Sequence, residues 1–265
     1  MSDLRPEINL AEVSKAYGRG RNAVPAVEYV NLDIRHNEFV SLLGPSGCGK
    51  STLMLMIAGL VKPSSGTISI EGRKVEGPQR TNGIVFQDPV LLPWRTVLDN
   101  VLLPIELMGE NVAAYRNHAF ELLEIAEIAD FTDRLPHELS GGMRQRAGIC
   151  RALIQHPTLL LMDEPFSALD AMMRVELQDL LLQLWRELGL TILFVTHDLD
   201  EALYLAQRVL VLSASPGTVA DVVDVPLPYP RNQVETRSQS VYLEMRERLY
   251  RLMVEQVMSG RVSAS

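Results

Sequence analysis

Residues 44–52 read Gly44-Pro45-Ser46-Gly47-Cys48-Gly49-Lys50-Ser51-Thr52, with the pattern G-x-x-x-x-G-K-[ST]. An apolar run at 39–43 precedes this loop as a predicted strand, and 52–58 continues it as a predicted helix. In such a unit the glycines let backbone N–H groups point at phosphate oxygens, and the helix N-terminus adds partial positive charge. Lys50 supplies charge for the β- and γ-phosphates, and the Ser51 hydroxyl can ligate Mg²⁺. The loop therefore predicts a nucleoside triphosphate site rather than a glycine-rich turn with a chance lysine.

The composition is that of an ordinary globular protein, because 47% of the 265 residues are hydrophobic and 22% are charged. The net charge of −8 disfavours nucleic acid as a partner. The longest apolar stretch, 53–61, is far shorter than the ~20 residues that span a bilayer. Residues 1–7 lack the apolar core of a secretory signal. Cys48 and Cys150 form no metal-type pair and are expected to be reduced thiols in the cytosol.

The hydrophobic pattern of the first half predicts strands followed by helices. Residues 7–43 are strand-like, and 66–87 carry two apolar segments punctuated by proline and glycine, which predicts short antiparallel strands. From about 96 to 155 the pattern is helical, and one amphipathic helix is expected to end near Ala129. A further helix is expected from Ser140 to about Gln155.

The last third alternates apolar runs with helical segments, which predicts an α/β fold. Continuous apolar runs at 159–162, 192–195 and 209–212 are typical of strands buried on both faces of a parallel sheet. Residues 214–235 are interrupted by prolines and predict a loop or an extended linker. Residues 238–257 predict one final helix.

Two carboxylates follow a predicted buried strand in Leu159-Leu160-Leu161-Met162-Asp163-Glu164. In a parallel sheet Asp163 can come beside the phosphate loop and organise the Mg²⁺ shell. Glu164 is then placed to polarise an attacking water as a general base. The alternative is an acidic loop after a core strand, which the upstream phosphate loop makes less favoured.

A second anion site is predicted in Leu139-Ser140-Gly141-Gly142-Met143-Arg144-Gln145-Arg146. Ser140 is a good N-cap, yet two glycines in the first turn of a helix reduce its stability. Their presence is explained if a phosphate must approach the bare amides of Gly141 and Gly142. A helix start that happens to carry two glycines is the alternative.

Three further residues have a functional and a structural interpretation, and the residues alone leave both open. His197 follows a predicted strand and can contact a γ-phosphate, although a lone histidine is often structural. Gln87 ends another strand and can contact metal or water, or can simply be a polar strand end. Tyr17 can stack on a purine, or can be an aromatic residue on an edge strand.

These motifs, in this order, resemble the ATP-binding cassette ATPases. The family's segments correspond to the Walker A loop Gly44–Thr52, the Q-loop Gln87, the signature Leu139–Gln145, the Walker B strand Leu159–Asp163 with Glu164, the D-loop Ser167-Ala168-Leu169-Asp170, the H-loop His197 and the adenine-stacking Tyr17. Met143 stands where the common signature has glutamine, but Ser140, Gly141 and Gly142 are in place.

The resemblance covers about residues 7–235 and implies one ATPase domain, with a helical tail at 236–265. It implies a P-loop NTPase (RecA-like) core with an N-terminal antiparallel β subdomain and an inserted α-helical subdomain at about 88–155. It also implies ATP and Mg²⁺ as ligands, with the metal near Ser51, Gln87 and Asp163. Lys50, Gln87, Glu164 and His197 are the implied catalytic residues.

Family resemblance further implies a head-to-tail dimer of two such chains. Each ATP then lies between the Walker A loop of one chain and Ser140, Gly141 and Gly142 of the other. Asp170 is implied to lie at the dimer seam, and His197 is implied to contact the γ-phosphate. Nucleotide binding would close the dimer, and hydrolysis would open it.

The segment Gln87-Asp88-Pro89-Val90-Leu91-Leu92-Pro93-Trp94-Arg95-Thr96-Val97 resembles cassettes of the nitrate/sulfonate/taurine importer group. In transporter cassettes this region receives a helix of an integral membrane permease, so Leu91, Leu92 and Trp94 are expected to dock one, unless they fill the local core. The resemblance implies that the chain lies on the cytoplasmic face of the inner membrane and works with permease subunits and a solute-binding protein. An exporter ATPase with separate membrane subunits and a soluble cassette ATPase outside transport are the alternatives.

Overall fold

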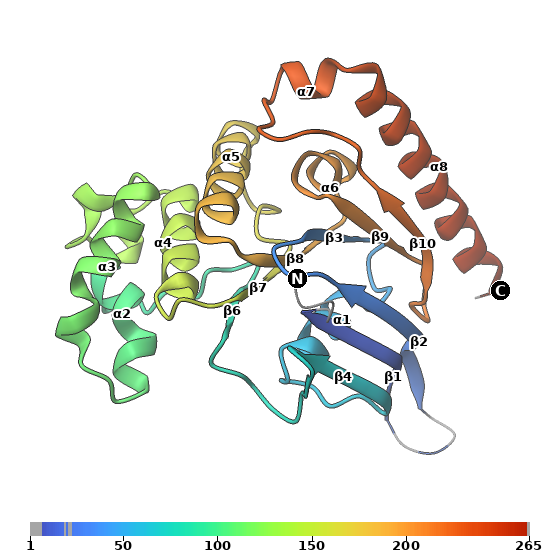
Figure 1. Ribbon diagram of the computed structural model, residues 1–265, viewed down its shortest axis with the longest axis horizontal. Coiled ribbons are helices and arrows are strands. Elements are labelled where there is room, and N and C mark those ends of the chain that lie inside the picture. Colours follow the sequence, from blue (N-terminus) through green and yellow to red (C-terminus); the bar gives the residue numbers. More distant parts are fainter. Residues whose placement is uncertain (1–6, 19, 21–22, 264–265) are drawn as a thin grey trace, which may run out of the picture. The chain divides into compact units, whose positions relative to one another are not determined.

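The computed structural model describes residues 7–18, 20 and 23–263, with side chains described through Met258. It contains two compact units, which are Met1–Gln79 together with Thr191–Ser265, and Arg80–Leu190 (Figure 1). Residues 1–6, where no secretory signal is expected, and residues 264–265 of the predicted tail lie outside the described part. The domain boundaries expected at 7–235 and 88–155 stay predictions.

Four strands of the first unit form an antiparallel sheet in the order β2-β1-β4-β5. These strands are β1 (Ile8–Tyr17), β2 (Val24–Ile34), β4 (Ser65–Ile70) and β5 (Arg73–Lys74). Figure 1 shows β1, β2 and β4 side by side. The sheet confirms the expected antiparallel pairing of the first apolar segment in 66–87.

The same unit contains the strand that leads into the phosphate loop. β3 (Phe39–Leu43) lies between β8 (Thr191–Thr196) and β9 (Arg208–Leu212), and it pairs in parallel with both. Every residue of β3 and β8 is buried, which explains their continuous apolar runs. Helices follow two of these strands directly: α1 (Lys50–Ile57) comes after β3, and α6 (Leu199–Leu205) after β8.

The prediction of a loop or linker throughout 214–235 was wrong. β10 (Val219–Asp224) extends the sheet by pairing antiparallel with β9. Val223, which is buried, lies opposite Val209 of β9. The strand forms because the prolines lie at Pro216 and from Pro226 onward, on either side of β10, so every residue of β10 keeps the N–H group that a ladder needs.

The second unit combines two parallel strands with four helices. β6 (Asn82–Val85) pairs with β7 (Leu159–Asp163). Two short 3₁₀ turns at 129–131 and 136–138 lie between the third and fourth helices of the chain. The helices are α2 (Val97–Leu107), α3 (Val112–Ile125), α4 (Gly141–Leu153) and α5 (Ala171–Leu188).

Two predictions for this unit were wrong in detail. The second apolar segment of 66–87 was expected in an antiparallel pair, but β6 is parallel to β7. Gly83 permits this placement, because a Cβ there would lie only 2.7 Å from the carbonyl oxygen of Ala152 in α4. The helix expected to end near Ala129 ends at Ile125, since Glu127 adopts a left-handed backbone with φ of 57°.

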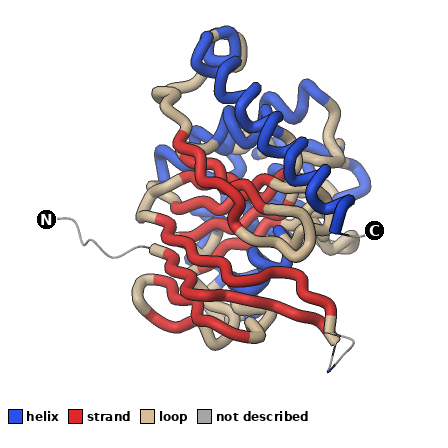
Figure 2. The backbone as a smooth tube through the Cα atoms, turned by 90° about the vertical axis from the view of Figure 1, so that its right-hand side faces the viewer, coloured by secondary structure: helices blue, strands red, loops and turns tan. Residues whose placement is uncertain are grey.

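The C-terminal part of the first unit is helical. α7 (Glu235–Ser238) precedes α8 (Ser240–Ser263), which Figure 2 shows as the long helix leading to the C-terminal label. The expected final helix is thus confirmed, but it begins later and ends later than predicted. α8 is attached to α6 through Asp200, whose carboxylate accepts hydrogen bonds from Tyr242 and Arg246, both at 2.9 Å.

Both cysteines are buried free thiols, and burial raises the pKa of Cys150 to about 12.

A second titratable feature of the unit 80–190 is a pair of stacked histidines. The rings of His118 and His156 have centroids 4.0 Å apart. The loss of solvent at the contact, together with the neighbouring His118, lowers the pKa of His156 below its ordinary value, while Glu121 acts in the opposite direction.

This histidine pair predicts a loss of stability in acid. The unfolded chain binds a proton at His156 near its ordinary pKa of about 6.5, whereas the folded chain binds it only at lower pH. The contribution of neutral His156 to the free energy of unfolding is therefore complete above about pH 6.5 and is lost as the pH falls. His156→Asn, which tolerates the left-handed backbone, should show a smaller decrease in Tm than the wild type between about pH 7.5 and about pH 5.5. Equal decreases would contradict the prediction.

Candidate functional site

The loop between β3 and α1 is shaped by glycine. Gly49 has a φ of 96°, and a Cβ on it would lie 2.5 Å from the carbonyl oxygen of Ala26 in β2. Gly47 has a φ of 79°, and no heavy atom lies within 4 Å of the place where its Cβ would be. The loop thus packs against β2 at Gly49 and stays open at Gly47, where a phosphate would approach.

Lys50 is buried, and the loop's own backbone holds its ammonium group. Its Nζ donates to the carbonyl oxygens of Gly44 at 2.9 Å and Pro45 at 3.1 Å. A buried charge needs such partners, so the side chain is fixed beneath the loop. Ser46 and Ser51 are exposed, Thr52 is half-buried, and Cys48 packs inside.

Gly217 completes the loop and was not singled out as a site residue from the sequence. Its N–H donates to Ala26 at 3.0 Å, and its carbonyl accepts from Glu28 at 2.9 Å. A Cβ on Gly217 would lie 2.0 Å from the carbonyl oxygen of Cys48. The turn Ser215-Pro216-Gly217 is visible in the sequence, but only the folded chain brings it against the phosphate loop.

Two other expected contacts belong to the same unit. Tyr17, at the end of β1, is 46% exposed, and its hydroxyl lies 3.4 Å from Oγ1 of Thr52. His197 follows β8 and is exposed. Its turn is fixed by Thr196, whose Oγ1 donates to Glu201 at 2.6 Å and accepts from the Asp198 N–H at 3.0 Å. The roles of Tyr17 and His197 stay predictions.

The paired carboxylates Asp163 and Glu164 follow β7 in the other unit, and both are half-buried. Glu164 has a left-handed backbone with φ of 45°, which costs a non-glycine residue of order 1 kcal/mol. Ser167 holds this conformation, because its N–H and its Oγ both donate to the Glu164 carbonyl, at 3.2 and 2.9 Å. The turn therefore fixes the direction in which the Glu164 side chain leaves the strand.

The signature segment forms a capped helix start, as expected. Ser140 caps α4 by accepting from the Met143 N–H at 3.2 Å. A Cβ on Gly142 would lie 3.0 Å from Sδ of Met173 in α5, so this glycine permits close packing of the two helices. Asp170 caps α5 by accepting from the N–H groups of Met172 and Met173 at 3.0 Å.

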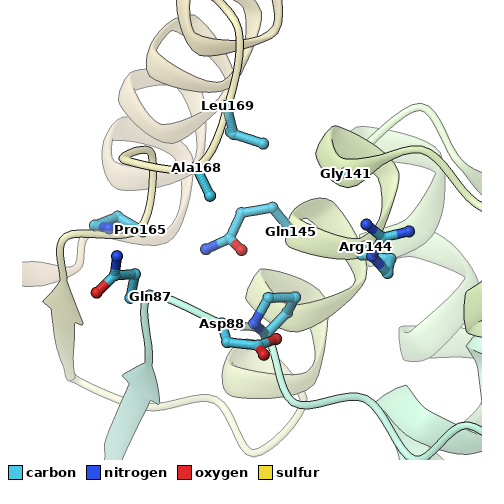
Figure 3. A pocket seen from close by; sticks show the side chains of 9 residues that line it. Gln87, Asp88, Gly141, Arg144, Gln145, Pro165, Ala168 and Leu169 are labelled. Atoms are coloured by element: carbon cyan, nitrogen blue, oxygen red, sulfur yellow. The ribbon is translucent and has the colours of Figure 1, made fainter.

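A cavity of about 440 Å³ brings three of the expected motifs together (Figure 3). Gln87 comes from the end of β6, Gly141 from the start of α4, and Leu169 from the turn before α5. Gln145 of α4 also reaches this cavity and was quoted from the sequence only as part of the signature segment. The cavity is lined by Gln87, Asp88, Pro89, Gly141, Arg144, Gln145, Pro165, Ala168 and Leu169.

The segment after Gln87 is exposed yet firmly anchored. Trp94 is 72% exposed and does not fill the local core, whereas Leu91 and Leu92 are half-buried. Asn100 of α2 is fully buried and binds the backbone of the segment, because its Nδ2 donates to three carbonyls and its Oδ1 accepts from the Leu92 N–H. Arg151 of α4 donates to the carbonyl of Val90 at 2.9 Å.

The described residues contain neither a candidate membrane span nor a candidate metal cluster. No helix there is long and apolar enough to cross a bilayer. No group of three or more His, Cys, Asp and Glu side chains in the same part of the chain could hold a metal ion. The donors expected for Mg²⁺, which are Ser51, Gln87 and Asp163, stay predictions. They include only one carboxylate, and a Mg²⁺ ion with so few protein ligands usually completes its shell with substrate phosphates and water.

Gly217 gives a test of the phosphate loop. Gly217→Ala forces Cys48 to move, because the new Cβ would overlap its carbonyl oxygen. We expect nucleotide to bind at least about tenfold more weakly, since strain of ~1–3 kcal/mol must be relieved at the loop. Equilibrium binding of a fluorescent ATP analogue measures this. Gly77→Ala is the matched control, because no heavy atom lies within 4 Å of its Cβ position; equal affinities for the two variants would refute the role of Gly217.

Comparison with known proteins identifies relatives along most of the chain. Residues 27–167 match the family described as ABC transporter. The chain is 40% identical over 257 residues to an uncharacterized ABC transporter ATP-binding protein of Methanocaldococcus jannaschii, covering 97% of this chain and 95% of that protein. It is 43% identical over 227 residues to the aliphatic sulfonates import ATP-binding protein SsuB of Bacillus licheniformis, covering 86% of this chain and 88% of that protein.

Among solved structures, the chain is similar to the ATP-binding cassette MJ0796 in a dimeric post-hydrolysis state bound to ADP and Pi. The TM-score is 0.73 with 35% identity, over 82% of this chain and 98% of that chain. A second dimeric structure of MJ0796, described as a bacterial ABC transporter cassette, gives a TM-score of 0.73 with 36% identity. The α/β fold expected from the sequence, with a P-loop NTPase core, is thereby confirmed.

The family match covers more than half of the chain, and the similarity to relatives extends over nearly all of it. The fold, the glycine-rich phosphate loop and the sequence similarity all indicate the same family. The chain belongs to the ABC transporter family, as one of its ATP-binding cassette proteins.

Proposed function

We propose that the chain is the ATP-hydrolysing subunit of a multi-subunit membrane importer for a small solute of the nitrate, sulfonate or taurine type. The observation that carries this proposal is the similarity to SsuB proteins, which are named for aliphatic sulfonate import, at 42–43% identity over 85–86% of the chain. The exposed segment after Gln87 supports it, because that segment resembles the same importer group. Such a subunit lies on the cytoplasmic face of the inner membrane.

Binding of ATP begins at the phosphate loop. Lys50 already has its ammonium group beneath the loop, 2.9 Å from the Gly44 carbonyl, and needs only a small movement to reach phosphate oxygens. The open backbone at Gly47 and the N-terminus of α1 supply the N–H groups. Tyr17, which is partly exposed, stacks on the adenine ring.

Hydrolysis uses carboxylate, histidine and amide side chains at the ends of strands. Glu164 accepts a proton from the attacking water, and its strained turn keeps the carboxylate pointed in one direction. His197 donates to the γ-phosphate and stabilises the charge that develops there. Ser51, Gln87 and Asp163 would hold Mg²⁺, which neutralises the phosphates when it is bound.

Two copies of the chain are needed for a complete site. The family resemblance implies that the phosphate loop and the signature with Ser140 of one chain do not hold the same ATP. The head-to-tail dimer of the family lets the capped start of α4 from one copy bind the ATP held by its partner. The dimeric state of the MJ0796 structures supports this arrangement. The family resemblance then puts Asp170, which caps α5, at the seam of the dimer.

Closure of the dimer must act on a membrane subunit, and the segment 86–95 is suited to receive one. Phe86, Val90 and Trp94 are all exposed apolar side chains, at 39%, 59% and 72%. Asn100 and Arg151 fix the backbone that carries them. An exposed apolar group on a rigid support is the usual form of a docking site, here for a permease helix. A solute-binding protein would deliver the solute to that permease.

Replacement of the proposed general base tests the hydrolytic mechanism. Glu164→Gln should lower the turnover of ATP by a factor on the order of 10²–10⁴, because the attacking water loses its proton acceptor. ATP should still bind and should trap a dimer, which size-exclusion chromatography with and without ATP detects. Lys50→Ala, which lacks the phosphate-binding charge, should not dimerise with ATP. Wild-type turnover in Glu164→Gln would exclude Glu164 as the base.

Replacement of the exposed tryptophan tests the transport assignment. Trp94→Ala should leave the ATPase rate of the isolated chain unchanged but reduce the permease recovered when the tagged chain is purified from its own membranes. Tyr250→Ala, which removes an exposed aromatic side chain from α8, is the control. If wild-type chain recovers no membrane subunit, the alternative of a cassette ATPase outside transport is favoured. Sulfonate, nitrate or taurine uptake by cells lacking the chain distinguishes import from export.

A further inference from the structure

Several buried side-chain nitrogen atoms of the unit 80–190 have no hydrogen-bond partner among the described residues, and Nε2 of Gln145 is the one that faces a cavity. Gln145, on the second turn of α4, is only 2% exposed. Its Nε2 is buried, and no described residue accepts a hydrogen bond from it. An unsatisfied buried donor costs about 1–3 kcal/mol, so a fold retains one only if another benefit compensates.

Gln145 projects into the cavity shared by the Q-loop, the signature helix and the D-loop. In Figure 3 its side chain extends from α4 toward Gln87 and Pro165, with its amide nitrogen at the leading end. Gln87 lies on the opposite wall and is exposed. Asp88 is the one carboxylate among the residues that line the cavity, and its Oδ1 accepts from the Val90 N–H at 3.1 Å.

Gln87 provides the acceptor that suits this donor. A side-chain amide oxygen has two lone pairs, so Oε1 of Gln87 can accept a hydrogen bond and still ligate a metal or water with the other. Hydrogen bonds from outside a metal's ligand set fix the orientation of the ligand, and their loss commonly weakens metal affinity or activity by about 10–100-fold. Without a donor, the Gln87 amide could present its NH₂ group in place of its oxygen.

We propose that Gln145 is a positioning residue, whose Nε2 donates to Oε1 of Gln87 and orients that oxygen toward the nucleotide-bound metal. This inference rests on the function proposed above. The hydrogen bond between the two amides would connect α4, which begins at the signature, to the Q-loop. The cavity of about 440 Å³ leaves both side chains the room to rotate into contact.

A double-mutant cycle tests the pair. Gln145→Leu removes the donor at nearly constant volume, and Gln87→Leu removes the acceptor. Metal affinity is measured in the Glu164→Gln background with ATP, by electron paramagnetic resonance of Mn²⁺. We expect each single change to weaken Mn²⁺ binding about 10–100-fold, and the double change to be no worse than Gln87→Leu. Additive losses, or unchanged affinity in Gln145→Leu, would overturn the proposal.

Two controls separate positioning from folding. Gln145→Leu should not lower the Tm of the nucleotide-free protein, because it removes an unsatisfied donor; a lower Tm together with weaker Mn²⁺ binding would assign Gln145 a structural role and overturn the proposal. Gln145→Met is the second variant if leucine does not pack. Gln183→Leu, an exposed glutamine of α5, should change neither Tm nor Mn²⁺ affinity.

The controls also separate this inference from the proposed function. The proposed function stands if the wild-type chain hydrolyses ATP and the Glu164→Gln variant forms a dimer with ATP. This holds whatever the double-mutant cycle shows. A chain that hydrolyses no ATP would refute that function and, with it, the role of Gln145. Additivity in an active ATPase would refute the amide pair alone.

Discussion

The phosphate loop depends on close backbone contact at positions that have no side chain. Gly49 lies against the Ala26 carbonyl, and Gly217 against the Cys48 carbonyl, so the loop is clamped between β2 and the turn before β10. The clamp holds the Gly44 and Pro45 carbonyls around the ammonium group of Lys50. A buried charge is tolerated only with such partners. In the function proposed above, ATP binding exchanges part of this carbonyl shell for phosphate oxygens.

The other motifs share one local device, a polar residue that fixes the turn between a strand or loop and the next helix. Ser140, Asp170 and Asp198 each cap a helix through their own side chains. Glu164 is fixed differently, because its left-handed backbone is held by two hydrogen bonds from Ser167. Short-range hydrogen bonds set each of these directions, so the local geometry of each motif depends on residues that are close in sequence.

Helix α4 connects several functions within the unit 80–190. Its first residues form the signature, Gln145 faces the Q-loop, and Arg151 near its end binds the backbone at Val90. A helix moves as a nearly rigid body, so in the function proposed above we expect a shift at the signature to move the segment that carries Trp94 as well. In the proposed importer this rigid connection relates ATP binding in the dimer to the permease.

The sequence alone determined the phosphate loop and the positions of the buried strands along the chain, because spacing and hydrophobic period are local properties. The resemblance of its motifs to a known family indicated the family. The sequence placed Gln87, Ser140, Glu164 and His197 at the ends of elements, where the structure also has them. Only tertiary structure decided that β6 is parallel to β7, that β10 completes a sheet, and that Gly217 supports Cys48. Those features depend on which distant segments meet, and a contact between residues far apart in sequence leaves no local pattern to read.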